Sequence, residues 1–65
     1  MPIITIETME GKTVDQKRGL IKDITQAVVK NFKVQPEQVN IIIHEMKFEN
    51  YAKGGVLRID RDSAK

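Results

Sequence analysis

Three consecutive isoleucines at positions 41–43 place the strongest constraint on the fold of this chain. β-Branched residues favour strands, and successive side chains of a strand point to opposite faces of the sheet. A strand over residues 40–46 therefore carries apolar side chains on both faces. Such a pattern is typical of a parallel sheet that is covered on both sides.

A first strand and a long amphipathic helix precede these isoleucines. Residues 3–8 are rich in β-branched side chains and alternate between two faces. Thr13 has the character of an N-cap, and Gln16 completes a capping box for a helix over residues 14–32. The apolar positions of that helix recur every three to four residues: Leu20, Ile21, Ile24, Ala27, Val28 and Phe32. The helix ends ahead of Pro36, and the order strand, helix, strand predicts a right-handed βαβ unit.

The C-terminal third is more polar and contains turn signals. Residues 36–39 predict a short helical turn, and Gly54-Gly55 supplies the turn of a hairpin. Residues 56–59 predict a short strand. Residues 60–65 are expected to be a frayed, disordered tail.

Size and face counting together predict an oligomer. One helix covers one face of a two-stranded sheet, so the isoleucine on the other face needs a partner. A domain of 65 residues is only marginally stable alone. The chain has no cysteine for a disulfide, and its single histidine cannot form a histidine cluster that binds a stabilising metal. We therefore expect one α+β domain (residues 1–65) that forms an obligate homo-oligomer, with its second sheet face and strand edge closed by other chains.

The charge pattern argues against several function classes. The net charge is +2, basic and acidic residues are interspersed, and the three aromatic residues are not interleaved with arginine or lysine. A nucleic-acid module is therefore poorly supported. Residues 1–20 lack the pattern of a signal peptide, and no apolar run reaches the roughly 20 residues of a membrane span. We expect a cytoplasmic protein with no membrane or nucleic-acid partner.

Pro2 is the main candidate for chemistry. Removal of Met1, which is favoured when the second residue is small, would leave a free prolyl nitrogen at the start of the first strand. An α-amino group has a pKa near 7.7–8.0, and apolar surroundings or nearby cations lower that pKa towards the useful range for a general base. The alternative is that Pro2 only begins an edge strand, where its missing N–H costs little.

An ordered set of landmarks runs from Pro2 to about Leu57. They are Met1-Pro2-Ile3-Ile4, Glu10-Gly11, Asp15-Gln16-Lys17, Ile42-Ile43-His44-Glu45-Met46 and Gly54-Gly55. Together they resemble the 4-oxalocrotonate tautomerase family. The resemblance implies a βαβ subunit with a C-terminal hairpin, dimers with a four-stranded sheet, and a hexamer built from three dimers. It also implies an isomerase that needs no cofactor and no metal.

The resemblance assigns roles to particular residues. Pro2 would be the general base that moves a proton within a small unsaturated 2-hydroxy or 2-keto acid, such as a 2-hydroxymuconate-like enol. Lys12 stands where the family has an arginine that holds a carboxylate. Asn40 stands where a second arginine reaches the site of a neighbouring subunit and polarises the carbonyl. Lysine keeps the charge without the bidentate fork, whereas asparagine brings no charge. Tyr51 would line the pocket, or Phe48 if the register slips.

Other polar residues carry weaker expectations. Arg58 and Arg61 would substitute for the missing arginines only if the C-terminal segment folded over a neighbouring site. His44 is expected to have a structural or interface role, and Glu45 to pair across a subunit contact. The departures at the two arginine positions leave a second hypothesis open: a catalytically weak oligomeric scaffold or binding protein that keeps the fold.

Overall fold

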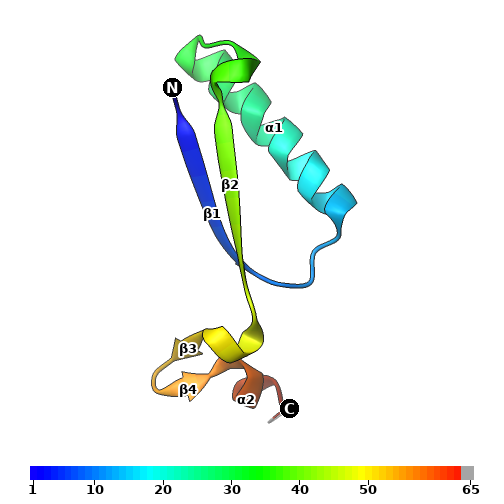
Figure 1. The fold of residues 1–65 in the computed structure, drawn as a ribbon, viewed down its shortest axis with the longest axis vertical. Helices are drawn as coiled ribbons and strands as arrows, with labels where there is room; N and C mark the ends of the chain where they lie inside the picture. Colours follow the sequence, from blue (N-terminus) through cyan, green and yellow to red (C-terminus); the bar gives the residue numbers. More distant parts are fainter. Residues whose placement is uncertain (64–65) are drawn as a thin grey trace.

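Two parallel strands form a small sheet beside the long helix in a computed structural model that describes residues 1–63 (Figure 1). Strand β1 covers Ile3–Met9 and strand β2 covers Asn40–Met46. They pair in parallel from Ile3 opposite Asn40 to Met9 opposite Met46. The predicted second strand is confirmed at both ends, and the first continues one residue beyond its predicted end.

The long helix connects the two strands, as predicted. Helix α1 covers Val14–Phe32, and its capping box is formed as the sequence indicates. The backbone N–H of Gln16 donates to Thr13 Oγ1 over 3.1 Å, and the backbone N–H of Thr13 donates to Gln16 Oε1 over 2.8 Å. At the other end Lys33 adopts a left-handed conformation (φ 59°), and its N–H donates to the carbonyl of Val29. A lysine is thus held where glycine is the usual residue.

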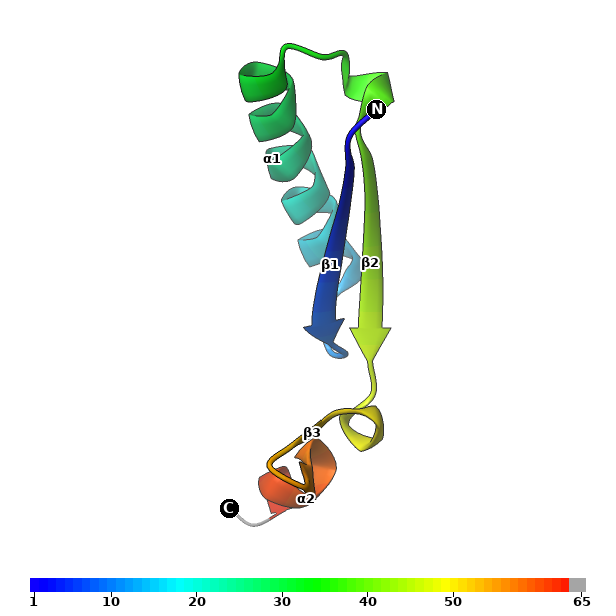
Figure 2. The same cartoon turned by 90° about the vertical axis from the view of Figure 1, so that its left-hand side faces the viewer.

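Helix α1 lies on one side of the two-stranded sheet (Figure 2). Ile4, Ile6, Ile41 and Ile43 are half-buried, which places them on the helix side of the strands. On the other face Ile42 stays 46% exposed. None of the described side chains is fully buried. Within one chain, therefore, the second sheet face is open, as the count of faces predicted.

The C-terminal segment forms a small unit beyond β2. Two short 3₁₀ turns flank β2: η1 (Pro36–Gln38) precedes the strand, and η2 (Phe48–Asn50) follows it and begins the C-terminal unit. The hairpin of β3 (Ala52–Lys53) and β4 (Val56–Leu57) turns at two glycines with φ of 60° and 81°. Positive φ at both positions is the requirement of a type I′ turn.

The predicted end of the chain was partly wrong. Strand β4 stops at Leu57, and helix α2 (Arg58–Ser63) follows, so residues 58–59 are helical instead of extended and residues 60–63 are not a frayed tail. The backbone N–H of Arg58 donates to the carbonyl of Tyr51 over 2.7 Å, which ties the start of α2 to the hairpin. The rest of the predicted tail, residues 64–65, lies outside the described residues.

The single chain is elongated. Its extents are 46 × 23 × 14 Å, because the C-terminal unit projects beyond the sheet along the long axis (Figure 2). The radius of gyration is 15.6 Å, whereas a compact domain of this length has about 11 Å. Across residues 1–63, no helix has the length and apolar character required to cross a membrane.

Candidate active site

Pro2 lies next to Asn40 at the amino-terminal end of the sheet. Pro2 directly precedes β1 and Asn40 is the first residue of β2. The backbone N–H of Asn40 donates to the carbonyl of Pro2 over 3.0 Å. Pro2 is half-buried, while the preceding Met1 is 83% exposed. The side chain of Asn40 donates through Nδ2 to the carbonyl of Gln38 over 3.2 Å. The side-chain amide of Asn40 therefore points towards the segment that leads into β2.

Lys12 lies at the opposite end of β1, in the loop that leads to α1. Gly11 has a φ of 121°, a conformation that favours glycine, and it turns the chain just ahead of Lys12. No ion pair or hydrogen bond of the Lys12 ammonium is found among residues 1–63. Lys12 therefore presents an uncompensated positive charge at this end of the sheet.

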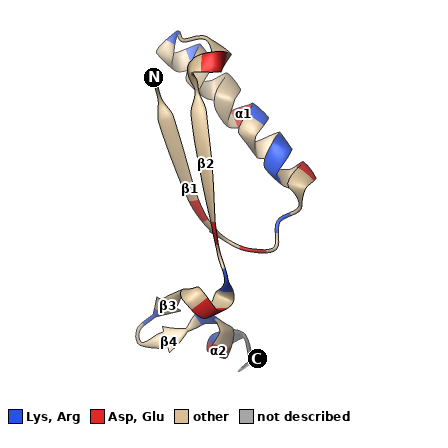
Figure 3. Ribbon diagram, in the orientation of Figure 1, with Lys and Arg blue, Asp and Glu red and all other residues tan. Residues whose placement is uncertain are grey.

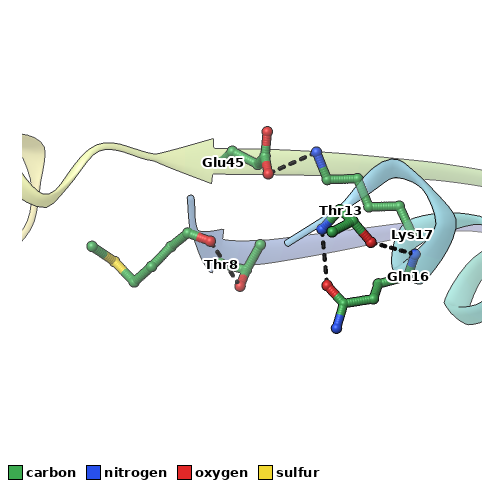
Figure 4. Close-up of polar contacts among 6 residues, drawn as sticks. Thr8, Thr13, Gln16, Lys17 and Glu45 are labelled. Carbon is green, nitrogen blue, oxygen red and sulfur yellow. Dashed lines mark hydrogen bonds and ion pairs between the residues drawn. The ribbon is translucent and has the colours of Figure 1, made fainter. Parts of the chain in front are cut away.

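A pocket of about 220 Å³ opens between the first half of α1 and the sheet. Its lining combines apolar and polar side chains: Ile6, Leu20, Ile43, Thr8, Lys12, Gln16 and Lys17. The charged group of Lys17 is held by Glu45, with Nζ and Oε2 2.7 Å apart (Figure 4). The two side chains are 28% and 34% exposed, so this ion pair is partly shielded from water.

The other candidate residues belong to the C-terminal unit. Tyr51 is 39% exposed and follows η2. The guanidinium of Arg58 lies over the ring of Phe48, 5.6 Å from its centre. Nε and Nη2 of Arg61 are buried without a hydrogen-bond acceptor among the described residues. Phe48 and Arg58 therefore contact each other, while Tyr51 keeps much of its surface in solvent.

The candidate residues fall into two groups at opposite ends of the sheet. Pro2 directly precedes β1 and Asn40 is the first residue of β2, whereas Lys12 and Tyr51 follow the two strands. The seven residues of β1 span about 23 Å at roughly 3.3 Å per residue. One chain therefore does not bring Pro2 and Lys12 together.

Sequence reasoning missed the contact between Lys17 and Glu45. Glu45 was expected to pair across a subunit contact, but it pairs with Lys17 of its own chain. A signal was available, because Glu45 shares its strand face with Ile41 and Ile43, the face that packs under α1. An acidic residue on that face lies opposite the first turns of the helix, where Lys17 is found.

The open face of the sheet carries a second polar pair. His44 Nδ1 and Glu7 Oε2 lie 3.0 Å apart, on opposing residues of β2 and β1. Both side chains are more than half exposed.

Elsewhere, basic and acidic positions are scattered over the chain instead of gathering on one face (Figure 3). Residues 1–63 contain no cluster of three or more potential metal ligands among their histidines and carboxylates.

Known proteins resemble this chain over nearly its whole length. A family model described as a tautomerase enzyme matches residues 2–61. A probable tautomerase of Listeria monocytogenes serotype 4b (strain F2365) is 43% identical over 60 residues, which cover 92% of this chain and 98% of that protein. A solved structure of a 4-oxalocrotonate tautomerase isozyme from Methylibium petroleiphilum has a TM-score of 0.89 at 41% identity, and covers 98% of this chain and 100% of its own. A heterohexamer 4-oxalocrotonate tautomerase from Chloroflexus aurantiacus J-10-fl has a TM-score of 0.81 at 27% identity, with coverages of 92% and 97%.

Proposed function

The chain belongs to the tautomerase family, a family of isomerases, and on this premise we propose that it interconverts the enol and keto forms of small unsaturated 2-hydroxy and 2-keto acids. The nitrogen of Pro2 is the proposed general base. The observation that carries this assignment is the position of Pro2, half-buried at the start of β1 behind a Met1 that is 83% exposed. An exposed methionine is accessible to removal, and its loss converts a tertiary amide into a free secondary amine.

The proposed reaction moves one proton and changes no oxidation state. The Pro2 nitrogen accepts the proton of the 2-hydroxyl group, and the oxygen becomes the ketone. The double bonds shift along the conjugated chain, and the protonated nitrogen then delivers the proton to a carbon of that chain. The conjugation of the substrate delocalises the charge, so the step needs no cofactor.

Lys12, Asn40 and Tyr51 have supporting roles in this proposal. The uncompensated ammonium of Lys12 binds a carboxylate of the substrate. The amide of Asn40, beside Pro2, donates a hydrogen bond to the oxygen that gains charge, with less stabilisation than an arginine would give. Tyr51 supplies an apolar wall and a hydroxyl.

The proposal requires that several copies of the chain build one site. The ends of β1 are about 23 Å apart, so Pro2 of one copy meets Lys12 and Tyr51 of another. Two copies that pair antiparallel into a four-stranded sheet, with their helices on one face, bring opposite ends of the strands together. Three such dimers in a hexamer would cover the open face around Ile42. The similarity to the heterohexamer from Chloroflexus aurantiacus supports this assembly.

The test is the rate of ketonisation of 2-hydroxymuconate by protein whose intact mass proves loss of Met1. The Pro2→Ala variant, shown to have the same oligomeric state, is measured beside it. We expect a rate well above that in buffer for the processed protein and loss of most of that rate in the variant. Equal rates for the two proteins would refute Pro2 as the base.

One observation favours a second candidate, a catalytically weak scaffold or binding protein. Asn40 brings no positive charge beside Pro2, and its amide already donates to Gln38 over 3.2 Å. This alternative predicts that no enol acid reacts faster with the processed protein than in buffer. A panel of enol acids with one and with two carboxylates distinguishes the two candidates.

A further inference from the structure

The pocket beneath α1 contains two lysines but only one uncompensated charge. Lys12 has no partner within residues 1–63, whereas Lys17 is bound to Glu45 over 2.7 Å. The carboxylate of Glu45 therefore cancels the second positive charge at this pocket. Since both groups of the pair are about two thirds buried, water and salt screen the pairing less than at an open surface.

The remaining wall of the pocket is mostly apolar, with Thr8 and Gln16 as its two uncharged polar residues. Ile6 and Ile43 rise from neighbouring positions of the sheet, since they oppose each other in the register of β1 and β2. Leu20 closes the helix side and is 44% exposed, so a ligand can reach it. A hydrocarbon chain suits these side chains, while a second carboxylate would lie against apolar surface and near the carboxylate of Glu45.

We infer that Glu45 makes this pocket select acids with one carboxylate and an apolar tail over acids with two carboxylates. This inference rests on the proposed function, because it concerns the substrate of the same site. Lys12 binds the single carboxylate, and the tail lies on Ile6, Leu20 and Ile43. Glu45 acts as a specificity-determining residue by withholding Lys17 from the ligand.

The kinetic test compares two enols that differ only in the distal group. 2-Hydroxyhexa-2,4-dienoate has a methyl group where 2-hydroxymuconate has its second carboxylate. In Glu45→Gln the ammonium of Lys17 is released, and kcat/KM for the diacid should rise about fivefold relative to the monoacid, mainly through KM. If the ion pair served only to hold α1 on the sheet, Glu45→Gln would change kcat/KM for both substrates by the same factor.

Two further variants separate charge from packing. Asp23→Asn removes the same negative charge from an exposed position of α1 outside the pocket, and should leave the diacid-to-monoacid ratio unchanged. The double variant Lys17→Gln/Glu45→Gln restores the wild-type charge balance, and its ratio should return to the wild-type value. An unchanged ratio in Glu45→Gln, or an equal rise in Asp23→Asn, overturns the inference.

A binding measurement separates this inference from the proposed catalysis. Hexa-2,4-dienoate and hexa-2,4-dienedioate lack the 2-hydroxyl group and do not react, so their dissociation constants can be measured by calorimetric titration of the Pro2→Ala protein with and without Glu45→Gln. A selective gain for the diacid together with no turnover of either enol upholds the inference and refutes the catalytic proposal. Turnover that depends on Pro2 with no change of ratio refutes the inference alone. Absence of binding of either acid refutes the inference and also the proposed role of Lys12 in holding the substrate carboxylate.

Discussion

The capping box at the start of α1 allows a stability prediction that can be worked from two hydrogen bonds. Thr13 and Gln16 exchange bonds of 3.1 and 2.8 Å, both of them exposed to solvent. Thr13→Ala removes the acceptor for the first bond and weakens the support for the second. Replacement of an N-cap threonine by alanine costs about 1 kcal/mol of the free energy of unfolding. For a chain of this size that cost lowers Tm by about 4–8 °C.

The comparison variants make this prediction specific. Thr13→Ser keeps the hydroxyl acceptor and should stay within about 0.3 kcal/mol of wild type. Gln16→Ala removes only the second bond and should cost about 0.5 kcal/mol. The two bonds join the same two residues, so each bond helps to orient the groups of the other. The double variant should therefore lose less free energy of unfolding than the sum of the losses in the two single variants.

Urea denaturation followed by circular dichroism, at one fixed chain concentration, measures these differences. The concentration must be fixed because assembly would add to the apparent stability. The explanation fails if Thr13→Ala loses less than about 0.3 kcal/mol, or if Thr13→Ser loses as much as Thr13→Ala. Either result would mean that the bond to the Thr13 hydroxyl does not stabilise α1 measurably.

Three further predictions concern other parts of the chain. Lys33→Gly should raise the free energy of unfolding by about 0.5 kcal/mol in urea denaturation, because glycine adopts the observed left-handed conformation without strain; a loss of stability would contradict this reasoning. Ile42→Lys should reduce the oligomer measured by sedimentation velocity, because it places a charge on the open sheet face, whereas Val14→Lys, at a more exposed apolar residue on the first turn of α1, should not. Lys12→Ala should raise KM about tenfold with a smaller change in kcat, because a charged hydrogen bond to a carboxylate is worth roughly 1.5 kcal/mol; an unchanged KM in steady-state kinetics would exclude Lys12 from binding.

The sheet and the long helix were predictable because their signals are local and repeated. Helix α1 begins and ends where the capping box and the residues before Pro36 indicate, and β2 matches its predicted bounds. Helix α2 has only 6 residues, too few for an apolar period to be visible. Its start depends on the bond from Arg58 to Tyr51, a contact through the hairpin that no local pattern reveals.

The candidate site was predictable only in part, for a related reason. That Pro2 and Asn40 lie side by side follows from parallel strands that start together. To predict the pairing of Lys17 with Glu45, one must know which face of β2 packs under α1. One must also know where each residue lies on its own helix or strand. Resemblance to a family indicates which positions belong to the site. Whether a charged side chain at the site is free to bind a ligand depends on its neighbours, as Glu45 shows for Lys17.

The elongated shape of the single chain has a consequence for how activity should depend on dilution. With no described side chain fully buried and a radius of gyration of 15.6 Å, an isolated copy lacks an enclosed interior. If neighbouring copies supply both that interior and the missing half of each site, the rate per chain will fall as the protein is diluted below the dissociation constant of the assembly. The number of copies present in a volume would then regulate the enzyme, without any separate effector.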